Sequence, residues 1–257
     1  MGTPTHLEIA LFGTASLLIA LASGATRIEL NSAQSYSSAG TTPDEAPVRD
    51  AVSTLQSWQK THGINIPLRI MIRPTSRSFV YPPDEIDVMI DSIRTLGHCL
   101  RPGTDDGFVF GVLHDEQGVL SVDEEANKRL VHLASKMGLK CVFHRACDGI
   151  LGERAQETLE AIRRCGFDGV LTAGGPHGGA VAQAERLREV RGIAADLGLE
   201  LIVGGGVRSG NVQTLTGALT GGRGRLWFHS ACLMVGEEGS ERVDEEEIRG
   251  IRGYLQS

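Results

Sequence analysis

Short apolar runs alternate with longer amphipathic segments along the whole chain. The runs are rich in Val, Ile, Leu and Phe and have the length of buried strands, whereas the segments between them have helical spacing. The predicted strands are Leu7–Phe12, Thr26–Leu30, Leu68–Arg73, Gly107–Leu113, Lys140–Ala146, Gly169–Ala173, Leu201–Gly204 and Leu226–Ser230. The pattern therefore predicts repeated strand–helix units.

Three features support the predicted helices. Pro82-Pro83 precedes an apolar stripe from Ile86 to Ile93, and proline is favoured in the first turn of a helix. Ser121 and Glu124 have the spacing of a capping box for the next helix. Another stripe runs from Val181 to Leu197. Helices are thus expected between the third and fourth, fourth and fifth, and sixth and seventh strands.

The number and spacing of the units predict an α/β fold, a TIM-type (β/α)8 barrel that forms a single domain over residues 1–257. Roughly 31 residues separate the starts of successive strands, as expected for eight units in a barrel of ~250 residues. The same alternation could also build a doubly wound open sheet, which is the structural alternative. Eight units that fill the chain favour the closed barrel.

Composition and charge narrow the classes of partner. The chain has 25 Lys and Arg against 32 Asp and Glu, which gives a formal net charge of −7. A protein that binds the phosphate backbone of nucleic acid needs a basic surface, so nucleic acid is excluded as an expected partner. Glycine is unusually frequent, with 33 residues. This excess indicates tight turns or places where a ligand approaches the backbone closely.

The cysteines and the uncharged segment near the N-terminus indicate the cellular compartment in which the protein is found. There are five cysteines, with no C-x-x-C pair, which is typical of a reducing compartment. The uncharged segment Ile9–Thr26 resembles a signal peptide, but Glu8 lies at its start and no basic residue precedes it. Its glycine and serine residues also argue against a membrane-spanning helix. We expect a cytoplasmic protein with no membrane partner, and secretion is the alternative.

Charged and imidazole side chains interrupt the predicted strands, where an all-parallel sheet should be apolar. Burying an unpaired charge costs several kcal/mol, so these groups are paired or functional. One interpretation is a set of structural ion pairs, Glu8 with Arg27 or Glu29 with Arg73. The other is an active site, because several of these groups fall at the carboxyl ends of strands, where barrel enzymes place catalytic residues. The groups at these ends are Arg73, His144, Arg145 and His229.

Glycine-rich loops follow the last strands. Gly204, Gly205 and Gly206 come after the seventh strand, and Ser230 ends the eighth. In barrels these loops often bind phosphate through backbone N–H groups and a helix N-terminus. The alternative is that the glycines only form a tight turn.

One sequence pattern suggests a metal, Cys141-x-x-His144-x-x-Cys147. Residues three apart on a strand point to opposite faces, so these side chains converge only if the strand ends before Cys147. Thiolates are suitable ligands for Cu(I). A buried cysteine, however, is often just a small apolar residue. Both interpretations stay open.

Seven short motifs occur together and in order. They are Arg27-Ile28-Glu29-Leu30, Met71-Ile72-Arg73-Pro74, Phe108-Val109-Phe110-Gly111, Phe143-His144-Arg145-Ala146, Leu171-Thr172-Ala173-Gly174-Gly175, Gly204-Gly205-Gly206-Val207 and Phe228-His229-Ser230-Ala231. The set resembles the CutC copper-homeostasis family, over about nine-tenths of the chain. The resemblance implies a TIM-type barrel, an intracellular protein and a role in copper handling.

The chain departs from the family pattern at three places. Asn31 stands where the family commonly has a cysteine proposed as a copper ligand, which weakens direct copper binding there. Thr75–Ser78 replaces an Arg-Gly-Gly-Asp sequence, so part of an anion pocket is in doubt unless Arg77 substitutes. Cys147-Asp148 replaces Phe-Asp.

Two hypotheses from different classes result. The first, from the resemblance, is a copper-homeostasis protein that binds Cu(I) through thiols; the candidate ligands are Cys141, Cys147 and Cys232. The second is a barrel enzyme that acts on a small anion carrying phosphate or carboxylate. Its candidate acid–base residues are Glu8, Glu29, His144 and His229, and its candidate binding residues are Arg27, Arg73, Arg145, Gly204, Gly205, Gly206 and Ser230. The balance of these charges favours an anion over a naked cation. A binding protein without turnover and a homo-oligomer also stay open.

Overall fold

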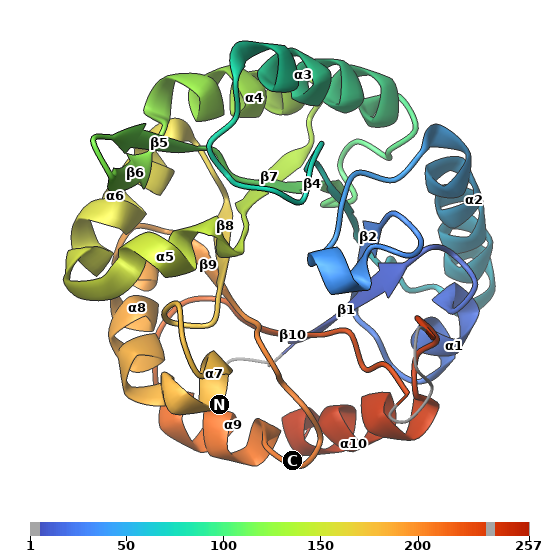
Figure 1. Ribbon diagram of the computed structural model, residues 1–257. Helices are drawn as coiled ribbons and strands as arrows, with labels where there is room; N and C mark the ends of the chain where they lie inside the picture. Colours follow the sequence, from blue (N-terminus) through green and yellow to red (C-terminus); the bar gives the residue numbers. More distant parts are fainter. Residues whose placement is uncertain (1–5, 235–239, 257) are drawn as a thin grey trace.

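The first strand, β1, pairs in parallel with both the second and the last strand of the sheet, and so closes the sheet into a barrel. The computed structural model describes residues 6–234 and 240–256, and Figure 1 shows the helices surrounding the barrel. Around the barrel the order is β1-β10-β9-β8-β7-β4-β3-β2. These strands are β1 His6–Phe12, β2 Arg27–Asn31, β3 Leu68–Met71, β4 Gly107–Phe110, β7 Lys140–Phe143, β8 Gly169–Thr172, β9 Glu200–Val203 and β10 Leu226–Ser230. The predicted TIM-type barrel is confirmed, and the open sheet is excluded.

The strand boundaries differ from the predicted ones mainly at the carboxyl ends. β3, β4 and β7 end two or three residues earlier than predicted, while the boundaries of the others are right or shifted by one residue. The reason is that the apolar run continues into the loop. The Arg73 N–H, for example, donates to the Thr42 hydroxyl instead of a strand neighbour (2.8 Å). Arg73 and His144 therefore lie in loops at the barrel mouth rather than on strands, and Arg145 begins a short 3-10 helix there.

The helices lie outside the barrel, in the order expected for strand–helix units (Figure 1). They are α1 Leu17–Ala22, α2 Glu45–His62, α3 Pro83–Gly97, α4 Glu124–Lys136, α5 Asp148–Leu151, α6 Ala155–Cys165, α7 Gly179–Ala182, α8 Ala184–Asp196, α9 Val212–Leu219 and α10 Glu245–Gln256, with short 3-10 helices at Tyr36–Ser38, Arg145–Cys147 and Gly152–Arg154. None of the helices in the described residues is long and apolar enough to cross a membrane. The segment Ile9–Thr26, which resembles a signal peptide in sequence, forms most of β1, a turn and α1.

An antiparallel hairpin, β5 (Leu113–Glu116) and β6 (Val119–Val122), was not predicted. Its turn has Gln117 and Gly118 at positive φ, which is the geometry of a tight hairpin turn. The predicted capping box is wrong, because Ser121 belongs to β6. The side chain of Asp123 caps α4 instead, accepting from the Ala126 N–H (2.9 Å). The stripe from Val181 is likewise divided between α7 and α8.

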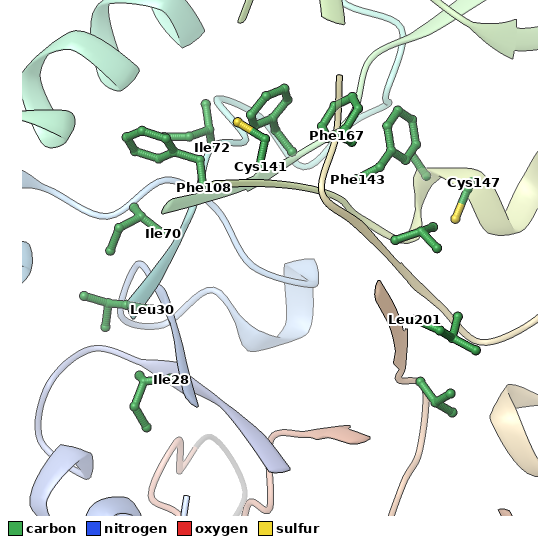
Figure 2. Close-up of a cluster of buried hydrophobic side chains, with 14 of the residues drawn as sticks. Ile28, Leu30, Ile70, Ile72, Phe108, Cys141, Phe143, Cys147, Phe167 and Leu201 are labelled. Atoms are coloured by element: carbon green, nitrogen blue, oxygen red, sulfur yellow. The ribbon is translucent and has the colours of Figure 1, made fainter. Parts of the chain in front are cut away.

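Two apolar clusters fill the molecule. One lies between the barrel and its helices, and Figure 2 shows part of it, with Ile28, Leu30, Phe108 and Phe143. The other contains one residue from each of six strands, as expected for a layer inside the barrel. Its members are Met71, Val109, Val142, Leu171, Ile202 and Trp227. β1 and β2 do not contribute to this layer; instead they carry three buried charged side chains, Glu8, Arg27 and Glu29.

Candidate functional site

A cavity of about 540 Å³ opens at the carboxyl ends of the barrel strands. Many of the residues predicted for the site line it, among them Glu29, Arg73, His144, Arg145, Gly205, Gly206, His229 and Ser230. Glu8, Arg27 and Gly204 do not line it. Aromatic side chains that the sequence reasoning had not singled out, Phe12, Tyr36 and Phe79, contribute apolar wall. The barrel thus gathers most of the predicted residues at one opening, as the position of strand ends in TIM barrels requires.

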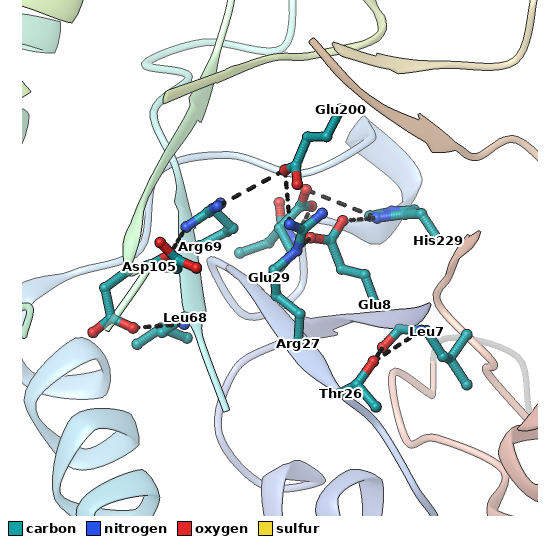
Figure 3. Close-up of polar contacts among 12 residues, drawn as sticks. Leu7, Glu8, Thr26, Arg27, Glu29, Leu68, Arg69, Asp105, Glu200 and His229 are labelled. Carbon is teal, nitrogen blue, oxygen red and sulfur yellow. Dashed lines mark hydrogen bonds and ion pairs between the residues drawn. The ribbon is translucent and has the colours of Figure 1, made fainter. Parts of the chain in front are cut away.

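A buried ion network lies inside the barrel at β1, β2, β3 and β9 (Figure 3). The Arg27 guanidinium pairs with the Glu8 carboxylate through Nε and with Glu200 through Nη1 (2.8 Å), and it stacks over the Trp227 ring at 3.7 Å. Arg69 lies 3.8 Å from the same Glu200 oxygen. The predicted structural pair Glu8–Arg27 is therefore confirmed. Its function is to hold one carboxylate of the candidate site in a fixed position.

His229 on β10 connects this network to the cavity. Its Nδ1 lies 2.6 Å from Oε1 of Glu8 and 4.0 Å from Oε2 of Glu29. Burial alone would lower the pKa of His229, but the carboxylates of Glu29 and Glu8 outweigh it, and the pKa is raised. For Glu8, burial is opposed by Arg27 and His229, which bring its pKa down to about 2. Glu8 is thus an ionised partner that orients the imidazole.

Glu29 on β2 has a different environment from Glu8. Its Oε1 accepts from the Asn31 side chain (3.1 Å), whereas its buried Oε2 has no hydrogen-bond partner in the described part of the chain. Burial raises the pKa of Glu29, and the negative charge of Glu8 adds to this effect, against the opposing charge of His229. The alternative predicted pair, Glu29 with Arg73, is absent from the ion pairs of the described residues. Glu29 is therefore a carboxyl that can take or give a proton at the cavity.

His144 follows β7 and lies at the cavity as a neutral imidazole. Burial lowers the pKa of His144 to about 3, and the charge of Arg73 contributes in the same direction. Its Nδ1 accepts from the Ala146 N–H (3.4 Å), so its proton is on Nε2, a buried donor without a partner among residues 6–234 and 240–256. The Phe79 ring lies edge-on to it at 4.8 Å. The site therefore offers one neutral hydrogen-bond donor at this wall.

Arg73 has a mainly structural role at the mouth. Its Nη1 donates to the Ser38 and Gly40 carbonyls, and its Nη2 donates to the Ser76 carbonyl (3.1 Å). The guanidinium thus holds together the two loops that follow β2 and β3. Because its terminal nitrogens are already used, Arg73 is less available to a ligand than the sequence suggested.

Arg145 and Arg208 are the more available cations at the cavity. The side chain of Arg145 is 46% exposed, and its Nε donates to Asp148 (2.7 Å), which leaves its terminal nitrogens for a ligand. Arg208, which the sequence reasoning missed, lines the same cavity and donates to the Leu233 carbonyl (3.2 Å). The sequence feature that could have identified Arg208 is its position in the loop after β9. The positive charge of the rim therefore comes from the loops after β7 and β9.

The loops after β9 and β10 are joined at the rim. The Ser230 hydroxyl donates to the Val207 carbonyl (2.7 Å), so Ser230 fixes the glycine loop. Gly205 and Gly206 both have positive φ, at +94° and +82°. A Cβ at Gly205 would lie 2.8 Å from the Cβ of Ala173 and 3.4 Å from the Arg145 guanidinium carbon, whereas a Cβ at Gly206 would meet nothing within 4 Å. The glycines are thus needed for the turn, and both line the cavity.

The cysteines are dispersed. Cys141 and Cys147 are each enclosed by apolar side chains in the outer core (Figure 2), and Cys232 is buried in the loop after β10. Burial raises the pKa of all three thiols, that of Cys232 to about 12. In the described residues the only group of three or more potential ligands among His, Cys, Asp and Glu is Glu8, Glu29 and His229. The thiols therefore do not converge on one point.

Comparisons with known proteins agree with the fold and with the motifs. The model of the CutC family matches residues 5–225. A CutC family protein from Porphyromonas gingivalis W83 is 34% identical over 213 residues, which is 82% of this chain and 75% of the relative. A CutC family protein from Xanthomonas campestris pv. campestris 8004 is 34% identical over 231 residues, 88% of this chain and 82% of the relative.

Solved structures show the same architecture. CutC from Streptococcus agalactiae superposes with a TM-score of 0.73 at 24% identity, covering 87% of this chain and 97% of that one. Phosphoribosyl anthranilate isomerase from Thermotoga maritima superposes with a TM-score of 0.55 at 12% identity, covering 98% of each chain. At these identities the likeness is one of fold alone.

Proposed function

The chain belongs to the CutC family, and from that premise we propose that the barrel mouth binds a small anionic metabolite and carries out proton transfer on it. The observation that carries the proposal is the arrangement of charges around one cavity. A buried carboxyl, Glu29, and an imidazole, His229, lie at the floor, while Arg145 and Arg208 lie at the rim. Cations at the rim attract a phosphate or carboxylate, and the floor groups can then exchange a proton with the remainder of the molecule.

Each side chain would have a distinct role. Arg145 and the backbone at Gly205 and Gly206 would hold the anionic group. The neutral His144 would donate from Nε2 to an oxygen that gains charge, because a fixed donor in a site with little water stabilises such charge. Glu29 and His229 would move the proton, and Glu8 would orient His229. The apolar wall of Phe12, Tyr36 and Phe79 would bind a less polar part of the molecule.

The test is a thermal-shift screen of small phosphorylated and carboxylated metabolites against the wild type and two rim variants. Arg145→Ala should weaken binding by about 1.5–3 kcal/mol, the usual value of a hydrogen bond to a charged group. Gly206→Val should abolish it, because a side chain there would enter the cradle. A matched control is Gly221→Val, since Gly221 also has a positive φ (+75°) and open space around its Cβ, but does not line the cavity.

We expect the two glycine variants to be destabilised similarly and only Gly206→Val to lose the ligand. If no anion stabilises the wild type, or if both glycine variants retain the stabilisation, the cradle is wrong and the glycines serve only as turns.

A second candidate function is direct Cu(I) binding through thiols in the cytoplasm. It is favoured by the relative from Streptococcus agalactiae, described provisionally as a copper homeostasis protein, and by the absence of disulfides among the five cysteines. Burial of Cys141, Cys147 and Cys232 argues against easy access for the metal. Their replacement by Ser should lower the stoichiometry of an anaerobic Cu(I) titration if the candidate is right. Cys99→Ser, at the half-buried thiol, is the control, and unchanged tight binding in the triple variant would refute it.

A further inference from the structure

We propose that Glu8, Glu29 and His229 form a site for one divalent transition-metal cation at the floor of the cavity. The inference deepens the proposed function, on which it rests only in taking the barrel mouth as the functional site. It concerns a resident cation held by nitrogen and oxygen, which is separate from the binding of Cu(I) by thiols.

The three side chains come from neighbouring strands, β2, β1 and β10, and each presents one atom to the same point (Figure 3). The potential ligand atoms all lie within 4.8 Å of one another. From Nδ1 of His229 the distances are 2.6 Å to Glu8 and 4.0 Å to Glu29. Around a tetrahedral Zn²⁺ with bonds near 2.0–2.2 Å, ligand atoms are separated by roughly 3–3.5 Å. The observed triangle therefore needs only small side-chain adjustments.

Each carboxylate is held by a second side chain in the way that metal ligands usually are. The Arg27 guanidinium donates to Oε2 of Glu8, which leaves Oε1 directed at His229. Asn31 donates to Oε1 of Glu29 (3.1 Å), which leaves Oε2 free. Such outer contacts orient the ligating atoms of metal sites. Asn31 replaces a cysteine of the family pattern. In the proposed site it positions the carboxylate of Glu29 and is not itself a ligand of the cation.

An independent observation points to a missing partner. Oε2 of Glu29 is buried, and the whole residue is 3% exposed, yet this oxygen has no hydrogen-bond partner among the residues that the structure describes. A buried carboxylate oxygen without a partner is costly unless a proton or a cation compensates it. A cation between Glu29, Glu8 and His229 would provide that compensation.

The charges that face the site are compatible with a cation. On its inner side, Arg27 and Arg69 oppose it, but Glu200 contacts both of these guanidiniums and offsets part of their charge. Glu8 and Glu29 then supply two negative charges directly to the cation, which takes the place of the proton on Nδ1 of His229, so the imidazole binds in its neutral form. One nitrogen and two oxygens suit Zn²⁺, Mn²⁺ or Fe²⁺ better than Cu(I), which prefers sulfur.

The cation would keep a position open toward the cavity. Glu29 and His229 line the cavity, whereas Glu8 lies behind them. Three protein ligands and an open fourth position are the arrangement of catalytic zinc sites, as opposed to structural ones. An anionic group that enters past Arg145 could therefore reach the cation, and Glu29 and His229 would then act as ligands instead of proton carriers.

The experiment is a calorimetric titration of the full chain with Zn²⁺, after treatment with a chelator. We expect one Zn²⁺ per chain for the wild type and a loss on the order of 100-fold in affinity for Glu29→Gln. The matched control is Asp148→Asn, a buried carboxylate that lines the same cavity outside the proposed site, and it should bind Zn²⁺ like the wild type. Asn31→Ala should weaken binding about 10–100-fold through the loss of the outer contact.

Melting temperatures of the metal-free variants show whether each one folds. If the wild type binds no Zn²⁺, or if Glu29→Gln and Asp148→Asn weaken binding equally, the site is wrong. Anion binding is measured separately, by thermal shift on the metal-free protein. If an anion stabilises the protein but Zn²⁺ does not bind, the cation site is wrong and the proposed function stands. If Zn²⁺ binds but no anion stabilises the protein, the cation site stands and the proposed function is wrong.

Discussion

Arg27→Met is expected to lower the free energy of unfolding by about 3–5 kcal/mol, the cost of breaking a buried ion pair from one side. The guanidinium is 1% exposed and neutralises Glu8 and Glu200 together, so its removal leaves two buried carboxylates without their shared cation. Methionine is similar in length and apolar, so the variant removes the charge and the hydrogen bonds with little change of volume. Urea unfolding, with the midpoint and slope both fitted, measures the effect.

Arg49→Met provides the control for this prediction. Arg49 also pairs with a glutamate, Glu45, but the two side chains are 62% and 41% exposed, so the loss of unfolding free energy should be below about 1 kcal/mol.

The difference in unfolding free energy between the wild type and Arg27→Met should also depend on pH. Arg27 helps to hold the pKa of folded Glu8 at about 2, below its ordinary value of 4.5. The stabilisation is therefore complete above pH 4.5 and is lost as the pH falls toward 2. A loss like that of Arg49→Met, or one independent of pH in this range, would contradict the proposed importance of the network.

The barrel could be predicted from the sequence because its outer face follows a simple rule. Apolar side chains that pack between strands and helices recur at regular spacing, and this spacing identified all the barrel strands. The hairpin β5–β6 escaped prediction because its strands have only four residues each and are mostly not buried, so they do not follow the pattern of the barrel strands. The predicted strand ends at Arg73 and Ala146 lie beyond the observed ends at Met71 and Phe143, since local hydrophobicity does not show where the ladder of hydrogen bonds stops.

The candidate site was predicted only in part, because the position of a residue along its strand indicates where it lies in the barrel but not which side chains it contacts. The rule that barrel sites lie at carboxyl ends of strands correctly brought His144, Arg145 and His229 to one cavity. It could not show that Arg73 is used up by loop carbonyls, or that Glu200, far away in the sequence, pairs with Arg27. Such contacts depend on the register and on side-chain conformations around the closed sheet. The role of Asn31 beside Glu29 was hidden for the same reason.

The register also leads to a prediction for Gly107, which lies at the start of β4 between β3 and β7. A Cβ at this position would lie 2.0 Å from the Lys140 carbonyl oxygen and 2.6 Å from its carbon. Both atoms belong to the backbone of β7, so the contact can be relieved only by separating two paired strands. Gly107→Ala should therefore destabilise the protein by more than about 4 kcal/mol, in the range of exceptional single substitutions.

The same substitution at Gly192 is expected to have the opposite sign. Gly192 lies within α8, and a Cβ there would meet nothing within 4 Å. Alanine in a helix is favoured over glycine by about 0.5–1 kcal/mol, so Gly192→Ala should raise the free energy of unfolding by up to this amount. Chemical denaturation of both variants compares them directly. If Gly107→Ala were tolerated as well as Gly192→Ala, the pairing of β4 with β7 in this register would be wrong, and with it the placement of His144 and Arg145 at the cavity.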